Sequence, residues 1–235
     1  MPKKLTRKQI VKQDVVKSAV FKIWENIQNY PIHIAGSIIA LVSIIIFAYA
    51  WVSYSHSKYQ VVNEMFITAF NEYQSLNEDI KESKDETAKA AEKEKKYKNI
   101  ISILHTIQRD YPNTLYAPEA LYYLGNVFIK KGNYPKAIES FNECIKKTND
   151  DIIKGLALFS LTKALTYNHQ YQEAFQSLEQ LEKIESKPVS TEYILYQKAL
   201  VYKNKGDIEK SKELIQRIKT EFPTSLLIDE LENEK

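Results

Sequence analysis

Residues 121–144 read LYYLGNVFIKKGNYPKAIESFNEC, and this stretch decides the fold of the 235-residue chain. Its apolar side chains recur at helical spacing on both sides of Gly132 and Asn133, a pair of residues that favours a turn. Gly125 has no Cβ, so a second helix can approach closely there, and Ala137 is small enough to pack at the crossing. The stretch therefore predicts a hairpin of two α-helices.

The same pattern recurs downstream with a period of 37 residues. Residues 134–137 (YPKA) match residues 171–174 (YQEA), and residues 206–208 (GDI) lead into a third copy one further period along. Pro112 and Pro223 follow two expected helix ends and lie 111 residues apart, three times the same period. A fixed period of this size indicates stacked helical hairpins.

The first copy keeps six residues at characteristic offsets: Leu124, Gly125, Phe128, Tyr134, Ala137 and Phe141. These offsets resemble the tetratricopeptide repeat family, which implies a right-handed α-solenoid that binds partners on the face formed by the first helix of each hairpin. The family's usual repeat has about 34 residues, so we expect each inter-repeat loop to be lengthened. The second and third copies depart from the family, since Thr162 and Ala199 stand at the position of Gly125.

Upstream of these copies, residues 61–76 and 97–109 are expected to form the two helices of a degenerate first hairpin. Residues 79–96 between them are rich in Glu, Lys and Ala and carry equal numbers of acidic and basic side chains. A run of this kind is typical of a solvated helix with i,i+4 ion pairs. At the far end of the chain, residues 225–234 are expected to form a short acidic cap.

A long uncharged interval precedes the repeats, because no charged side chain occurs between Glu25 and Lys58. Within it, residues 34–54 read IAGSIIALVSIIIFAYAWVSY. As a helix this run would be about 31 Å long, which is enough to cross the hydrocarbon core of a bilayer. Seven Lys and Arg residues lie within residues 1–25, but only Lys58 lies in the twenty residues after the run. The positive-inside rule therefore predicts a cytoplasmic N-terminus and repeats on the other side of the membrane.

The net charge of +3 is the sum of a +5 tail in residues 1–25 and a net charge of −2 in the remainder. The basic excess is thus an orientation signal, and we expect no nucleic-acid partner. Two alternatives stay open for this end of the chain. The tail is either an amphipathic helix on anionic headgroups or an unstructured topogenic segment, and residues 48–50 (AYA) imitate a signal-peptide cleavage site.

The sequence thus predicts an all-α chain with one N-terminal transmembrane helix followed by a tetratricopeptide-repeat solenoid of about eight helices. The expected boundaries are a basic cytoplasmic segment at 1–33, the transmembrane helix at 34–54, a linker helix and degenerate hairpin with its charged insert at 55–116, and the capped repeats at 117–235.

Residues 13–24 and 29–31 before the apolar run, and residues 59–73 after it, resemble the bacterial ancillary SecYEG translocon subunit family. The resemblance implies a single-pass protein of the inner membrane with a periplasmic repeat domain. Its implied partners are translocon subunits, a periplasmic chaperone and exported polypeptides. Residues 110–125 also resemble periplasmic repeat proteins of the Tol-Pal and outer-membrane assembly systems, which implies the alternative of a scaffold for one folded partner.

The candidate protein-binding surface consists of aromatic residues at matched positions of the first helices, with polar neighbours that can reach a peptide backbone or carboxylate. Its members are Tyr122, Asn126, Lys130, Phe159, Lys163 and Tyr196. The alternative is that the three rings cover the seam between helices and belong partly to the core.

Catalytic chemistry is not expected. A single cysteine excludes an intramolecular disulfide and any multi-thiolate metal site, and Cys144 stands where the repeat takes a small buried residue. The four histidines are scattered without metal-ligand spacing. We therefore expect no enzyme activity, no metal, no cofactor and no small-molecule substrate.

Overall fold

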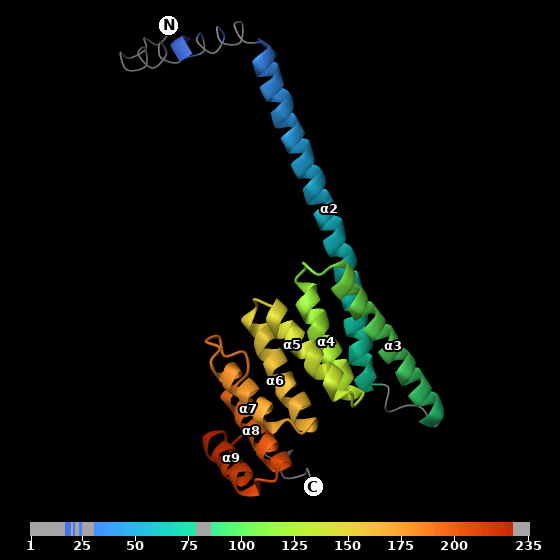
Figure 1. Ribbon diagram of the computed structural model, residues 1–235, viewed down its shortest axis with the longest axis vertical. Helices are drawn as coiled ribbons and strands as arrows, with labels where there is room; N and C mark the ends of the chain where they lie inside the picture. Colours follow the sequence, from blue (N-terminus) through green and yellow to red (C-terminus); the bar gives the residue numbers. More distant parts are fainter. Residues whose placement is uncertain (1–16, 20, 22–23, 25–30, 79–85, 228–235) are drawn as a thin grey trace, which may run out of the picture. The chain divides into compact units, whose positions relative to one another are not determined.

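The computed structural model describes residues 17–19, 21, 24, 31–78 and 86–227. Regular structure within these residues is helical, which confirms the predicted all-α class (Figure 1). The labelled helices are α2 (Pro31–Glu78), α3 (Glu86–Asp110), α4 (Tyr116–Lys130), α5 (Tyr134–Lys147), α6 (Asp151–Tyr167), α7 (Tyr171–Glu182), α8 (Thr191–Lys205) and α9 (Ile208–Glu221). Most of the basic segment 1–33, the start of the charged insert and most of the acidic cap lie outside the described residues.

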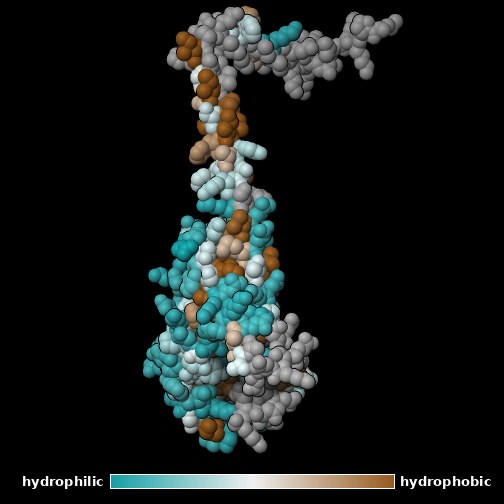
Figure 2. All heavy atoms as spheres, turned by 90° about the vertical axis from the view of Figure 1, so that its right-hand side faces the viewer, coloured by the Kyte–Doolittle hydropathy of each residue, from teal (hydrophilic) through white to brown (hydrophobic). Residues whose placement is uncertain are grey.

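The chain divides into two compact units, residues 1–58 and residues 59–235. The predicted apolar run 34–54 is helical throughout and lies in the first unit. Among the described residues, one helix is long and apolar enough to cross a membrane, and its apolar window is not buried by other parts of the protein. Ile44 and Phe47, for example, are each 69% exposed, and Figure 2 shows the hydrophobic side chains along this part of α2.

Helix α2 continues without interruption from Pro31 to Glu78. The expected transmembrane helix and the expected first helix at 61–76 are therefore parts of one helix. Residues 55–60 (SHSKYQ) contain neither Gly nor Pro, so nothing in the local sequence ends the helix between the two segments. Helix α3 begins at Glu86, so the described part of the charged insert, residues 86–96, is helical as predicted and continues into the expected helix at 97–109.

In the second unit the helices pack as hairpins, and the second helix of each hairpin keeps the predicted period. Helices α5, α7 and α9 begin at Tyr134, Tyr171 and Ile208, 37 residues apart. Helix α3 ends at Asp110 and α9 at Glu221, 111 residues apart, each just before the proline predicted to follow a helix end. The equal spacing identifies α3 as the second helix of a first hairpin whose first helix is the end of α2.

The expectation that each inter-repeat loop is lengthened is wrong for the loop between α5 and α6. Helices α7 and α8 are joined by the long segment 183–190, but α5 and α6 are joined only by residues 148–150. The short connection is fixed by Asp150, whose Oδ1 accepts hydrogen bonds from the backbone N–H of Ile152 at 2.7 Å and of Ile153 at 3.3 Å. That repeat reaches 37 residues through a 17-residue α6 instead.

The core is built from positions that repeat along the chain. Cys144, Leu181 and Ile218 lie one period apart in α5, α7 and α9, and each is at most 1% exposed. The predicted close approach at Gly125 is confirmed: a Cβ there would lie 2.5 Å from Cε1 of Phe141. Gly125 and Phe141 thus join α4 to α5 at a distance that only glycine allows.

Neighbouring hairpins are joined by contacts that also repeat. The ring of Tyr134, at the start of α5, lies 5.3 Å from the ring of Tyr167 at the end of α6. One period later, the hydroxyl of Tyr171 donates a hydrogen bond to the backbone carbonyl of Asn204 at 2.8 Å. The two pairs occupy equivalent positions in successive repeats. Successive hairpins are therefore joined at the same place.

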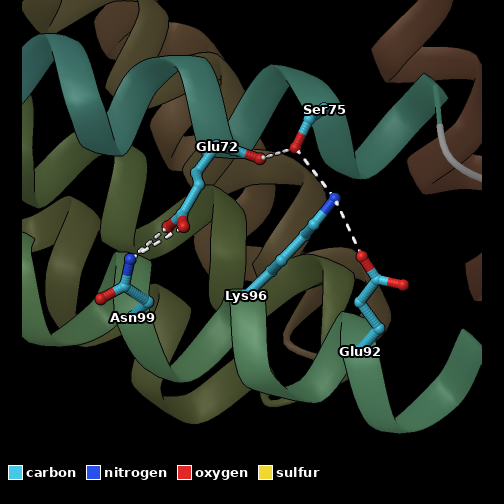
Figure 3. A network of polar contacts seen from close by, with 5 residues as sticks. All are labelled: Glu72, Ser75, Glu92, Lys96 and Asn99. Atoms are coloured by element: carbon cyan, nitrogen blue, oxygen red, sulfur yellow. Dashed lines mark hydrogen bonds and ion pairs between the residues drawn. The ribbon is translucent and has the colours of Figure 1, made fainter. Parts of the chain in front are cut away.

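The first hairpin has a polar seam between α2 and α3 (Figure 3). The Glu72 carboxylate accepts hydrogen bonds from Nδ2 of Asn99 at 2.8 and 2.7 Å, and Nζ of Lys96 donates to Oγ of Ser75 at 3.4 Å. Lys96 also forms an ion pair with Glu92 of its own helix at 3.9 Å. The charged insert is therefore more than a solvated surface, because its Lys96 also takes part in the packing of α3 against α2.

Candidate protein-binding surface

The predicted binding residues lie on the first helices of three successive hairpins. Tyr122, Asn126 and Lys130 are on α4, Phe159 and Lys163 are on α6, and Tyr196 is on α8. Helix α6 contacts both α4 and α8, so these three helices lie side by side in the second unit. We call the side of α4, α6 and α8 that carries these six residues the inner-helix surface.

The three aromatic rings of this surface are half-buried, and each packs against its own surroundings. Tyr122 lies 6.2 Å from the ring of Phe141 in the paired helix α5. Phe159 makes an edge contact at 6.3 Å with Tyr193, which is 48% exposed. Tyr196 packs against a smaller cluster that includes Leu195. Each ring therefore contributes to packing and still presents part of its area to solvent.

The polar members differ in what they contact. Nδ2 of Asn126 donates a hydrogen bond to the backbone carbonyl of Tyr122 at 3.0 Å, so that donor is engaged within α4. Nζ of Lys130 lies 5.4 Å from the ring centroid of Tyr73 on α2, and Nζ of Lys163 lies 6.0 Å from that of Tyr167. Cation–π contacts of this kind hold ammonium groups close to the protein surface.

Positive charge accumulates beside Lys130. Burial lowers the pKa of the Lys130 ammonium, and repulsion from Lys93 of α3 and Lys163 of α6 lowers it further. The ammonium groups of Lys93 and Lys163 therefore each lie near enough to Lys130 to act on its charge. An anion placed among them would relieve that repulsion.

An aromatic cluster centred on Tyr123 was not predicted from the sequence. Its ring makes edge contacts with Phe66 at 5.6 Å, Phe70 at 5.6 Å and Tyr73 at 5.4 Å, all on α2, and with Tyr122 at 5.2 Å. The hydroxyl of Tyr116 adds a hydrogen bond of 2.7 Å to Asn63 of α2. These contacts attach the end of α2 to α4 and place Tyr73 next to the inner-helix surface.

A cavity of about 410 Å³ opens between α6 and α8. Lys163 is the one predicted residue that lines it. The other described lining residues are Thr166, Tyr167, Gln197, Leu200, Lys203 and Asn204. Lys203 and Asn204 lie on α8 with the predicted Tyr196, and helical spacing from Tyr196 would have found both, because they follow it at i+7 and i+8.

Groups capable of chemistry are buried or dispersed. Cys144 is fully buried, and burial raises the pKa of its thiol to about 12, so the thiolate that a nucleophile needs does not form at neutral pH. Within the described residues, no group of three or more His, Cys, Asp or Glu side chains is arranged to hold a metal ion. The surface can offer apolar area, hydrogen bonds and positive charge to a partner.

Stacked two-helix repeats with a partly exposed surface on the first helices define a helical repeat protein of the tetratricopeptide class. Comparison with known families agrees, since the family described as tetratricopeptide repeat-like domain matches residues 30–226. The chain belongs to this family, whose fold serves protein interaction as an adaptor or scaffold. A comparison with curated proteins finds no match.

Several solved structures are similar in fold. PilF of Pseudomonas aeruginosa is 18% identical with a TM-score of 0.43, and the similarity covers 60% of this chain and 61% of that one. TPR-like repeats of a Podospora anserina protein named for the kinesin light chain are 16% identical with a TM-score of 0.47, covering 74% and 97% of the two chains. A point variant of the same protein is 16% identical with a TM-score of 0.48, and the similarity covers 68% of this chain and 93% of that one.

Proposed function

We propose that this protein is a single-pass adaptor of the bacterial inner membrane whose repeat domain lies in the periplasm. There it binds proteins at the Sec translocon and assists the transfer of exported polypeptides to a periplasmic chaperone. The apolar run 34–54 and the basic excess before it support the topology. The resemblance of the segments flanking the run to the ancillary translocon subunit family supports the choice of partners.

The observation that carries the binding role is the inner-helix surface itself. Tyr122 and Phe159 are anchored in the core on one side and reach solvent on the other, as rigid aromatic contacts at binding surfaces do. Lys130 and Lys163 stand beside them and can contact the carboxylates of a polypeptide. No chemical step is required of the protein in this role.

Because the protein is anchored in the membrane, a surface that binds polypeptides only weakly is sufficient for this role. A domain that is tied to the membrane meets polypeptides leaving a channel in the same membrane at a high effective concentration, which for short tethers reaches the millimolar range. Contacts that are weak one by one then give frequent capture and rapid release. Rapid release is needed if the polypeptide passes on to a chaperone.

Site-specific photocrosslinking in intact bacterial cells tests this proposal. A photoreactive amino acid is placed at Tyr122, Phe159 or Tyr196, and the products are identified by mass spectrometry. Exposed residues of the second helices at the same 37-residue spacing supply matched controls: Glu139, Gln176 and Glu213. Translocon subunits, a chaperone and many different exported chains are expected from the inner-helix positions, and few products from the controls.

Other patterns of crosslinking would contradict the proposal. A single stoichiometric partner from all inner-helix positions would instead identify a scaffold for one folded protein of an envelope complex. Equal crosslinking from both sets of positions would show that the inner-helix surface has no special role.

A further inference from the structure

We infer that one end of the repeat array rests on the lipid bilayer, with the exposed apolar side chains of Leu115 and Ile152 inserted into the membrane surface. Both residues lie where one hairpin connects to the next, Leu115 just before α4 and Ile152 in the first turn of α6. This inference rests on the membrane anchor of the proposed function and adds a second contact with the same membrane.

The two residues belong to a row that occupies one position of the repeat. Leu115, Ile152, Val189 and Leu226 follow one another at intervals of 37 residues. Leu115 and Leu226 are 79% and 80% exposed, and Ile152 is 58% exposed. A single exposed leucine is ordinary on a protein surface, but apolar residues that recur at one exposed position of a repeat indicate an interaction surface. We call Leu115, Ile152 and Leu226 the connection row.

Val189 is half-buried because its connection folds back on the array. Its side chain packs against the main core. The preceding Pro188 lies so close to α6 that a Cβ at Gly155 would be 2.1 Å from Cγ of Pro188. The long connection between α7 and α8 is therefore held against α6, and its apolar residue serves packing instead.

Contacts between hairpins place the connections at one end of the array. The start of α5 meets the end of α6 through the rings of Tyr134 and Tyr167, and the start of α7 meets the end of α8 through Tyr171 and Asn204. The turns within the hairpins therefore gather at one end. The connections between hairpins, which carry the connection row, gather at the other end.

The connection after α9 belongs to the same end. Phe222, which directly follows α9, packs against the small cluster that contains Leu195 near the start of α8. Leu226 lies four residues further along the chain. It therefore continues the connection row beyond the last hairpin.

The chain enters the second unit at this same end. Tyr59, the first residue of that unit, lines a cavity together with Leu115 and Ile153. Only residues 55–58 separate Tyr59 from Tyr54, the last residue of the apolar run. Five residue steps span at most about 18 Å even when fully extended, so Tyr59 and its neighbours stay close to the membrane surface in whichever direction the second unit lies.

A bilayer suits the connection row better than a charged partner does. The cavity beside Leu115 is lined by Lys147 and also by Glu119 and Asp150, so charges of both signs lie near the row. Lys147 already pairs with Glu143 at 2.6 Å. Leucine and isoleucine are stabilised by leaving water for the boundary between headgroups and acyl chains, and this needs no partner of defined shape or charge. The short tether keeps that boundary beside the row.

Quenching by labelled lipid in nanodiscs tests the inference on the full-length protein. The discs hold phosphatidylethanolamine and phosphatidylglycerol, with or without lipid that carries a nitroxide near the top of its acyl chains, and one protein copy each. An environment-sensitive fluorophore is attached at Leu115→Cys or Ile152→Cys. Ile208→Cys is the matched control, since Ile208 is 45% exposed and begins α9 at the opposite end of the array. Labelling of the unsubstituted protein checks that the buried Cys144 does not react.

We expect the nitroxide to quench the fluorophore at Leu115→Cys and Ile152→Cys at least about twofold more than at Ile208→Cys, because the first two lie at the depth of the upper acyl chains. The difference should persist between about 50 and 500 mM salt, since apolar insertion does not depend on ion pairs.

Insertion should also depend on the row itself. With the fluorophore at the exposed Asn113→Cys, L115S/I152S should lose the quenching and I208S should keep it. Circular dichroism melting shows whether each variant keeps its fold. L115S alone, which replaces one exposed side chain, repeats the measurement if the double variant has unfolded.

Three results would overturn the inference. Quenching at Leu115→Cys and Ile152→Cys could equal that at Ile208→Cys, or L115S/I152S could leave the quenching at Asn113→Cys unchanged. A blue shift of the emission without quenching, seen only when several copies share a vesicle, would identify a second copy of the chain as the occupant.

Failure of the inference and failure of the proposed function have different signatures. If photocrosslinks from Tyr122, Phe159 and Tyr196 to exported chains persist in any of these three cases, the proposed function stands and only the second membrane contact fails. Release of the wild type from membranes by alkaline carbonate would instead show that residues 34–54 do not anchor it, which contradicts the proposed function itself.

Discussion

The ring of Phe141 lies directly against the backbone of Gly125, so that a Cβ at Gly125 would be 2.5 to 2.7 Å from three ring carbons. Phe141 is fully buried. This contact sets the distance between α4 and α5 in the hairpin that most closely follows the repeat pattern.

Gly125→Ala should therefore destabilise the repeat unit by about 1–3 kcal/mol through overpacking. Urea unfolding of the full-length protein in mild detergent measures the change in the free energy of unfolding. In the Phe141→Leu background, the smaller and more flexible side chain should accept the added methyl group, so the cost of Gly125→Ala should fall. Equal costs in both backgrounds would show that the contact does not limit the approach of the helices.

Tyr123→Ala should cost about 3 kcal/mol, because it removes the ring at the centre of the cluster that attaches α2 to α4. Hydrogen exchange should show lost protection in residues 59–76 before other helices are affected. Tyr193→Ala removes a half-exposed ring from α8 and is the matched control, with little effect expected on residues 59–76. Unchanged exchange in Tyr123→Ala would contradict this role for the cluster.

The second helices differ in their N-caps, and this difference predicts unequal mutational costs. Oδ1 of Asn133 accepts a hydrogen bond from the backbone N–H of Lys136 at 3.3 Å, and Oδ1 of Asp207 accepts one from Lys210 at 3.3 Å. Gln170, at the equivalent position of α7, makes no cap hydrogen bond. Asn133→Ala and Asp207→Ala should each cost about 1 kcal/mol, whereas Gln170→Ala should cost much less.

Replacing Gln170 by Asn is the converse experiment. The shorter amide suits the cap, so Gln170→Asn should leave stability unchanged or raise it slightly, measured by the same urea unfolding. Destabilisation by about 1 kcal/mol or more would show that the hydrogen bond from Asn168 to Gln170, at 2.7 Å, is more important than the cap.

Glu119 predicts a specific dependence of stability on pH. Burial raises the pKa of its carboxyl, and the nearby Asp150 raises it further. Both residues line a cavity of about 590 Å³ at the loops that begin α4 and α6. A carboxyl whose pKa is higher in the folded state favours folding while it is protonated, so this contribution is lost as the pH rises from the ordinary glutamate pKa of about 4.3 towards the raised value.

Glu119→Gln should accordingly raise the melting temperature at pH 7, because the neutral amide carries no charge into this site. The advantage should shrink as the pH falls towards 4, where Glu119 is protonated in the unfolded chain as well. The exposed Glu139→Gln is the control, and it should show no comparable change between the two pH values. A melting temperature of Glu119→Gln below that of the wild type at pH 7 would contradict the prediction.

The parts of the fold that were predictable depend on short-range pattern. Gly125, the turn at Gly132 and the starts of α5, α7 and α9 follow from residues within one period of each other, and the structure confirms them. Loop lengths were not predictable from the period, because a longer α6 and a longer α7–α8 connection both give 37 residues. The continuity of α2 was not predictable from composition, because one helix can pass from apolar to amphipathic sequence without interruption.

The residues of the candidate site were predicted from helical spacing along single helices and from the 37-residue period between helices. Tyr122, Asn126 and Lys130 share one side of α4 by helical spacing. Tyr123 is adjacent in sequence to Tyr122, but its importance depends on Phe66, Phe70 and Tyr73, about 50 residues earlier and on another helix. Lys203 follows the predicted Tyr196 at i+7 on α8, so helical spacing indicates the same side of the helix, but its place in the cavity with Lys163 depends on the packing of α6 against α8.

The equal intervals between Asn133, Gln170 and Asp207 bear on how such a chain can change its length during evolution. Each interval contains one complete second helix and the first helix that follows it. Duplication or deletion of a gene segment that encodes one interval would join a first helix to a second helix at an equivalent turn. Selection can therefore enlarge or reduce the array by a whole repeat in a single event, while most random insertions would shift one helix against its neighbours.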